Sequence, residues 1–165
     1  MKEVCKICIG LKLNKAVVIG CGSIGTRYIR LLIDLKFSVN CYDIKKIDTS
    51  IFRDNVINYD SISKCIDCNP DIIIISTPPS SHLSCLVEAI KSNAKILLEK
   101  PIASSKKDSD RILEIDKKNK GRIWCVSNMR YHPGFIAIKN NIKKVGKVYY
   151  ANSYFSHKLS QMRKS

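Results

Sequence analysis

The stretch from Val17 to Ile29 reads V-V-I-G-C-G-S-I-G-T-R-Y-I, and the interpretation of the whole chain starts from it. An apolar run ends at Gly20, and Gly22 and Gly25 complete the pattern G-x-G-x-x-G before an amphipathic segment begins. This order predicts a strand, a tight turn and the start of a helix, the arrangement that binds the diphosphate of a dinucleotide. The first glycine permits the turn, the second lets the backbone approach the phosphates, and the third lets helix and strand pack closely. Backbone N–H groups at the helix start, together with the positive end of the helix dipole, would then face the anion.

An acidic residue, Asp43, follows Gly25 by 18 positions and ends the next predicted strand. A carboxylate at this place accepts hydrogen bonds from the adenosine ribose hydroxyls and repels a 2′-phosphate, so it favours NAD over NADP. Lys45 and Lys46 stand close behind and could neutralise a phosphate, which weakens the preference. The alternatives are a plain turn residue at Asp43 and a glycine-rich turn that binds nothing.

From Lys15 onward the sequence alternates between segments that predict strands and segments that predict helices. The predicted strands are 15–20, 37–42, 55–57, 71–76, 94–98, 122–126 and 147–155. The predicted helices are near 24–35, 60–69, 81–90, 105–118 and 132–142. Repeated strand–helix–strand units predict an α/β fold with a doubly wound parallel sheet, the Rossmann type, in which ligands bind at the carboxyl ends of the strands.

A second group of polar residues follows the predicted strand 94–98, where Glu99, Lys100 and Pro101 stand together. A lysine at this strand end would lie beside the bound ligand and be partly desolvated. Partial desolvation suits a lysine to proton transfer with a substrate hydroxyl. A surface ion pair at a strand end is the alternative, and spacing alone favours it.

Four motifs occur together and in order: G-C-G-S-I-G at 20–25, S-T-P-P-S-S-H at 76–82, E-K-P at 99–101 and N-M-R-Y-H-P at 128–133. With this combination the sequence resembles the Gfo/Idh/MocA oxidoreductases over residues 15–155. The resemblance implies hydride transfer between a nicotinamide cofactor and a hydroxyl carbon, usually of a sugar or cyclitol. It also implies that Lys100 is catalytic, polarising the substrate hydroxyl and touching the nicotinamide ribose, and that Glu99 contacts the cofactor ribose.

The same resemblance extends the predicted cofactor site to two further segments. Thr77, Pro78 and His82 match a loop that lines the cofactor, while Asn128 and Arg130 match a segment near the carboxamide and the substrate. A solvent-facing histidine at a helix start is the alternative for His82. The complete predicted cofactor-binding set is Gly20, Gly22, Ser23, Ile24, Gly25, Asp43, Ser76, Thr77, Pro78, His82, Glu99, Lys100, Asn128 and Arg130.

Family members are usually much longer than this chain, and their second α+β domain binds substrate and often builds a dimer. The predicted organisation is an N-terminal extension at 1–14, an NAD(P)-binding Rossmann domain at 15–146, and the first strand of a truncated second domain at 147–165. The family's D-x-x-x-H element, which carries a catalytic histidine, has no match, because Asp116 is the last aspartate and Lys120 stands four positions later. Two hypotheses follow: an incomplete sugar dehydrogenase whose full-length relatives are homo-oligomers, or a non-catalytic dinucleotide-binding module that lacks its substrate domain.

The net charge is +15, but the lysines are spread along the chain without aromatic interleaving, which favours a solvated surface over nucleic-acid binding. No apolar run is long enough to span a membrane, and no signal peptide is recognised, so the prediction is a cytoplasmic protein without membrane contacts. The eight cysteines include the pairs Cys5/Cys8 and Cys65/Cys68. Free thiols that fill apolar space are favoured over the alternative of a zinc site, so no metal is predicted.

Overall fold

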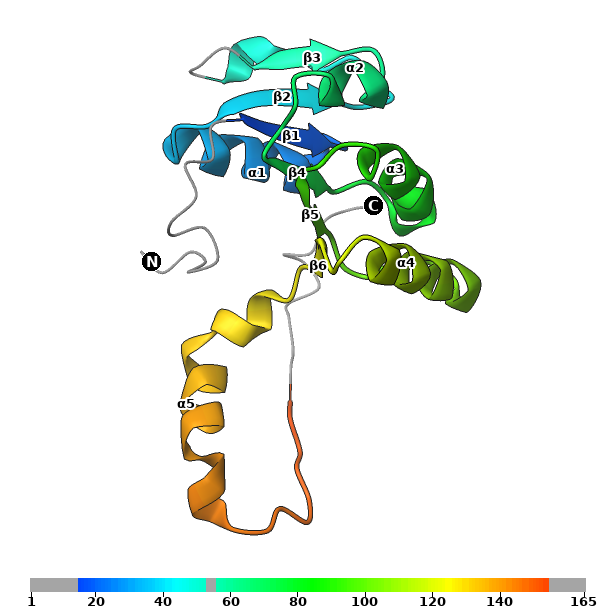
Figure 1. Cartoon of the computed structure of the whole chain (residues 1–165). Coiled ribbons are helices and arrows are strands. Elements are labelled where there is room, and N and C mark those ends of the chain that lie inside the picture. The colour runs from blue at the N-terminus through cyan, green and yellow to red at the C-terminus, as the bar shows by residue number, and fades with distance from the viewer. Residues whose placement is uncertain (1–14, 53–55, 155–165) are drawn as a thin grey trace. The chain divides into compact units, whose positions relative to one another are not determined.

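The computed structural model of the chain describes residues 15–52 and 56–154 (Figure 1). The chain divides into two units, the first ending at Val126 and the second beginning at Ser127. The predicted extension at 1–14, which includes Cys5 and Cys8, lies outside the described residues.

Six parallel strands form a single sheet in the first unit, in the order β3-β2-β1-β4-β5-β6. Their bounds are β1 Lys15–Ile19, β2 Ser38–Tyr42, β3 Ile57–Tyr59, β4 Ile72–Ile75, β5 Lys95–Leu98 and β6 Ile123–Cys125. β1 pairs with β2 on one side and with β4 on the other, so the direction of winding reverses between β1 and β4. The predicted doubly wound parallel sheet is therefore confirmed, with the third strand two residues later than predicted.

Helices connect the strands of the first unit. They are α1 Ser23–Asp34, α2 Ile62–Ile66, α3 His82–Ala89 and α4 Lys106–Lys118, with short 3₁₀ turns η2 Thr49–Ile51 and η3 Pro79–Ser81. Ser105 begins α4 as predicted, since its side-chain oxygen accepts a hydrogen bond from the backbone N–H of Asp108 at 3.1 Å. A serine cap of this kind satisfies one of the N–H groups that a helix start leaves without an intrahelical partner.

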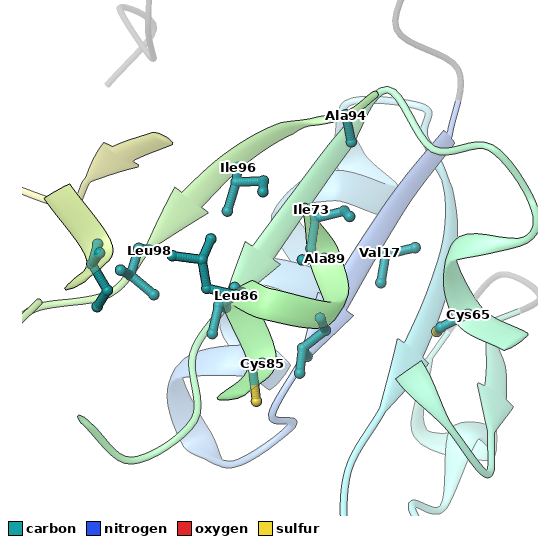
Figure 2. Packing of buried hydrophobic residues seen from close by; sticks show 12 residues of the cluster. Val17, Cys65, Ile73, Cys85, Leu86, Ala89, Ala94, Ile96 and Leu98 are labelled. Carbon is teal, nitrogen blue, oxygen red and sulfur yellow. The ribbon is translucent and has the colours of Figure 1, made fainter. Parts of the chain in front are cut away.

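Apolar side chains cover β1 on both faces of the sheet. Val17 and Ile19 belong to a buried cluster with Leu86 of α3, shown close by in Figure 2. Val18 points to the opposite face and packs with Ile29 of α1. Burial on both faces explains why this strand reads as an unbroken apolar run rather than an alternating one. It also holds the carboxyl ends of β1 and its neighbours at one fixed edge.

The second unit consists of short helical segments among its described residues. η4 spans Asn128–Tyr131, α5 spans Pro133–Asn141 and η5 spans Ile142–Val145, so the helix predicted near 132–142 is confirmed. His132 caps α5, because its Nδ1 accepts the backbone N–H of Gly134 at 3.1 Å.

Residues 147–154 form no strand, although the sequence predicted one from 147 to 155. A strand needs a neighbouring strand to complete its ladder of hydrogen bonds, and the described residues of the second unit include none. Among the described residues, moreover, no helix has both the length and the apolar character needed to cross a membrane.

Candidate functional site

The predicted site residues of the first unit lie in the loops that follow β1, β2, β4 and β5 or in the first turns of α1 and α3. In a parallel sheet these loops share the edge formed by the carboxyl ends of the strands. The winding reverses between β1 and β4, and a crevice at such a reversal is where doubly wound sheets bind their ligands. The loop after β1 lies at this reversal and is therefore the centre of the candidate site.

The glycine loop at residues 20–25 contains three glycines, and the environment of each one differs. Gly20 has a φ of +87°, and a Cβ added there would lie 2.6 Å from the backbone nitrogen of Thr77. A Cβ at Gly25 would overlap the carbonyl oxygen of Gly20. A Cβ at Gly22, by contrast, would meet no atom of residues 15–52 and 56–154 within 4 Å. The protein itself needs glycine at the first and third positions, whereas the open space at Gly22 fits the close approach of a ligand.

The helix that follows this loop begins without any capping group. Gly22 is the N-cap of α1, no side chain accepts a hydrogen bond there, and the first turn carries no acidic residue. Neither the N-cap nor the first turn of this 12-residue helix therefore supplies a carboxylate to the first N–H groups and the positive end of the dipole. The bare loop and the uncapped helix together fit the diphosphate of a dinucleotide.

Asp43, at the end of β2, holds the glycine loop from the side. Its Oδ2 accepts the backbone N–H of Cys21 at 2.7 Å, and its Oδ1 accepts the backbone N–H of Lys45 at 2.9 Å. A carboxylate has about four acceptor positions, so roughly two remain for hydroxyl donors of a ligand. The structure therefore brings Asp43 and the glycine loop together, as the sequence predicted.

Ser76, at the end of β4, joins the loops on the two sides of the winding reversal. Its hydroxyl donates to the carbonyl oxygen of Gly20 at 2.7 Å, and its backbone N–H donates to Ile19 at 2.8 Å. The next residues, Thr77 and Pro78, continue from this point into η3. Within the described residues, the hydroxyl proton of Ser76 is thus used to hold Gly20.

His82, the first residue of α3, is fully buried. Its Nε2 lies 2.9 Å from the carbonyl oxygen of Thr77, and its Nδ1 lies 3.2 Å from that of Ile102. The solvent-facing alternative for this histidine is therefore wrong, because a ring that contacts two backbone carbonyls is enclosed between them. His82 links the loop after β4 to the loop after β5, and helix-start position alone gave no sign of that burial.

We expect His82→Ala to lower the free energy of unfolding by about 2–4 kcal/mol, because it leaves a cavity in place of a fully buried ring and removes both contacts to backbone carbonyls. Urea denaturation followed by far-ultraviolet circular dichroism measures this change. Ser84→Ala is the control, since Ser84 is exposed and its hydroxyl donates to the carbonyl oxygen of Ser81, the N-cap of the same helix, so its loss should cost less than about 1 kcal/mol. Equal destabilisation by the two variants would contradict the linking role of His82.

Glu99 and Lys100 follow β5 at the same edge of the sheet. The Oε2 of Glu99 accepts the backbone N–H of Lys100 at 3.0 Å, and its Oε1 accepts the hydroxyl of Tyr28 at 2.7 Å. The side chain of Lys100 is exposed, so the described residues do not supply the partial desolvation that the sequence predicted. Tyr28, on α1, was not among the predicted site residues, because its contact with Glu99 joins positions 71 apart.

Two predicted residues, Asn128 and Arg130, lie in η4 of the second unit. Within this turn the backbone N–H of Arg130 donates to the carbonyl oxygen of Ser127 at 3.1 Å. Their contribution to the cofactor site stays a prediction.

Four of the described cysteines, Cys21, Cys41, Cys65 and Cys85, are buried and fill apolar space. Cys21, the x of the first G-x-G, is buried with its sulfur against backbone carbonyls of β1 and β2. Burial raises the pKa of the Cys65 thiol to about 12, which keeps it in the neutral form that fills space. Over residues 15–52 and 56–154, no three His, Cys, Asp or Glu side chains gather closely enough to hold a metal ion.

Comparison with known proteins gives a family model that matches residues 14–127 and is described as an oxidoreductase family with an NAD-binding Rossmann fold. Inositol 2-dehydrogenase of Salmonella typhimurium is 27% identical over 146 aligned positions, which cover 78% of this chain and 41% of the relative. The YteT protein of Bacillus subtilis is 32% identical over 81 residues, covering 48% of this chain and 19% of YteT.

Among solved structures, the WlbA dehydrogenase of Chromobacterium violaceum, determined with NADH and UDP-GlcNAcA, superimposes with a TM-score of 0.72. It is 19% identical, and the match covers 82% of this chain and 41% of that one. At this identity the likeness shows a common fold. The chain thus spans about two fifths of the length of the dehydrogenases that it matches over most of its own length.

Proposed function

Because the chain belongs to the Gfo/Idh/MocA oxidoreductase family, whose shared domain is an NAD-binding Rossmann fold, we propose that it binds NAD across the carboxyl edge of its sheet. We propose further that it serves hydride transfer between this cofactor and a hydroxyl carbon of a sugar or cyclitol. The bound nicotinamide would supply the hydride acceptor or donor.

The open space at Gly22 is the observation that carries the proposal. Gly22 has φ −58°, a value that any residue adopts, and in the part of the chain that the structure describes no atom lies within 4 Å of where its Cβ would be. The fold therefore gives no reason for a glycine here, whereas a diphosphate resting on the backbone does. The uncapped start of α1 beside it adds N–H donors and a favourable dipole.

Each remaining residue of the edge has a proposed role. Asp43 accepts hydroxyls of the adenosine ribose with the acceptor positions that Cys21 and Lys45 leave free. Glu99 accepts hydroxyls of the nicotinamide ribose, on the other side of the winding reversal. Lys100 exchanges a proton with the substrate hydroxyl once the site is closed against water.

The substrate class rests on relatives rather than on the described residues. The matched relatives include proteins named inositol 2-dehydrogenase, and WlbA was solved with NADH and UDP-GlcNAcA. These names support a polyhydroxylated substrate whose hydroxyl carbon is oxidised. Asn128 and Arg130 of the second unit are proposed to contact the carboxamide or the substrate.

A thermal-shift measurement tests the cofactor proposal directly. A ligand that binds only the folded state at about 100 times its Kd stabilises it by about 2.7 kcal/mol, which for a chain of this size raises the Tm by roughly 5–10 °C. We expect NAD to raise the Tm by this amount and NADP to raise it less at equal concentration. Absence of a shift with either nucleotide at millimolar concentration would contradict the proposed function.

A further inference from the structure

We propose that Tyr28 is a positioning residue of the cofactor site, which fixes the Glu99 carboxylate so that its free acceptor positions receive a vicinal diol. The diol is that of the nicotinamide ribose, so this assignment rests on the proposed function. Neither the glycine motif nor the residues after β5 include Tyr28. Its role follows from one contact between α1 and the end of β5.

The contact has the geometry of a strong hydrogen bond. The hydroxyl of Tyr28 lies 2.7 Å from Oε1 of Glu99, within the short range of hydroxyl–carboxylate bonds. The other carboxylate oxygen, Oε2, accepts the backbone N–H of Lys100 at 3.0 Å. Because each oxygen has its own donor, the carboxylate cannot rotate about its last bond without breaking one of the two.

The count of acceptor positions then points to the ligand. A carboxylate offers about four acceptor positions, and Tyr28 and the Lys100 amide use two of them. One free position remains on each oxygen. Two acceptors side by side match two neighbouring hydroxyl groups, and a ribose presents such a pair.

The same helix connects this diol site to the diphosphate site. Gly22 caps α1, and Tyr28 stands six positions later, which at 1.5 Å per residue is about 9 Å along the helix axis. α1 is packed on the sheet through Ile29, the residue next to Tyr28. One rigid element thus sets both the diphosphate cradle and the orientation of Glu99.

The electrostatics keep Tyr28 in the donating form. Partial burial raises the pKa of its phenol above the usual value, and the hydrogen bond to the Glu99 carboxylate raises this pKa further. The hydroxyl is therefore protonated, and able to donate, throughout the pH range in which dehydrogenases are assayed.

Calorimetric titration of this chain with NAD and with ADP tests the assignment. ADP carries the adenosine and the diphosphate but no second ribose. We expect Tyr28→Phe to weaken NAD binding by about 10-fold, the scale of one hydrogen bond to a charged group, and to change ADP binding by less than about 2-fold. Tyr59→Phe is the matched control, since Tyr59 is also partly buried and its hydroxyl has no hydrogen-bond partner among the described residues.

A double-mutant cycle with Glu99→Ala supplies the second measurement. In the Glu99→Ala background, Tyr28→Phe should weaken NAD binding by less than about 2-fold, because the partner through which it acts is gone. Three outcomes would overturn the positioning role. Tyr28→Phe could weaken NAD and ADP binding equally, could leave NAD binding unchanged, or could weaken NAD binding by the same factor with and without Glu99→Ala. A wild-type chain that binds neither nucleotide would overturn the proposed function itself, and this assignment with it.

Discussion

Gly22→Ala is expected to weaken NAD binding by at least about 100-fold, or roughly 2.7 kcal/mol, while the free energy of unfolding stays within about 1 kcal/mol of the wild-type value. The added methyl group projects into space that none of the described residues occupies, at a φ that alanine adopts without strain. The fold therefore tolerates it. The diphosphate, which needs that space to reach the backbone, is displaced.

Gly25→Ala is the matched variant, because the same methyl group produces the opposite outcome there. Its Cβ would overlap the carbonyl oxygen of Gly20, so α1 must move away from β1. We expect a loss of about 3 kcal/mol or more in the free energy of unfolding. Urea denaturation and calorimetric NAD titration of both variants separate the two effects. A Gly22→Ala chain that binds NAD as tightly as wild type would remove the main support for a diphosphate on this loop.

Asp43→Asn is expected to shift the preference for NAD over NADP by about 10- to 100-fold toward NADP. The reason is electrostatic, because the repulsion between a carboxylate and a nearby 2′-phosphate costs about 1–4 kcal/mol of binding free energy, depending on the local dielectric. The amide oxygen of asparagine can still accept the N–H of Cys21, so the glycine loop keeps its support. Lys45, directly behind, would then attract the phosphate without competition.

The ratio of the two dissociation constants, obtained by calorimetry, is the relevant measurement for this variant. Lys45→Gln in the Asp43→Asn background is the control, and it should return part of the shift by weakening NADP binding alone. If Asp43→Asn changes NAD and NADP affinity by the same factor, Asp43 serves the loop backbone and does not select the cofactor.

The sheet and the glycine loop could be predicted because their causes are local in sequence. Strands buried on both faces read as apolar runs, as 72–75 does with four consecutive isoleucines. The positive φ of Gly20 and the contact of Gly25 with the carbonyl oxygen of Gly20 each require glycine. The spacing of the glycines in the sequence therefore predicts the geometry of the loop. Asp43 was found for the same reason, since its distance along the chain from the motif is set by one helix and one strand.

The contacts that were missed depend on distant parts of the chain. Tyr28 and Glu99 meet because α1 packs on the sheet beside β1 and β4, and β5 is the next strand after β4. This neighbourhood follows from the strand order and not from periodicity in the sequence. The burial of His82 was also missed, because its ring contacts the carbonyl oxygens of Thr77 and of Ile102, the latter 20 positions later in the chain. Lys100 is exposed among the described residues, and its partial desolvation beside a bound nicotinamide stays a prediction, because desolvation depends on what covers a residue and no local pattern encodes that.

The hydrogen bond from Ser76 to Gly20 has a consequence for how fast a cofactor could enter. It ties the loop after β4 to the loop after β1, and Thr77 lies so close to Gly20 that a Cβ there would be 2.6 Å from its backbone nitrogen. A cradle held in this way is preformed, so little conformational entropy is lost on association. Capture of a dinucleotide by this edge would then be governed by diffusion and orientation rather than by a slow rearrangement of these loops.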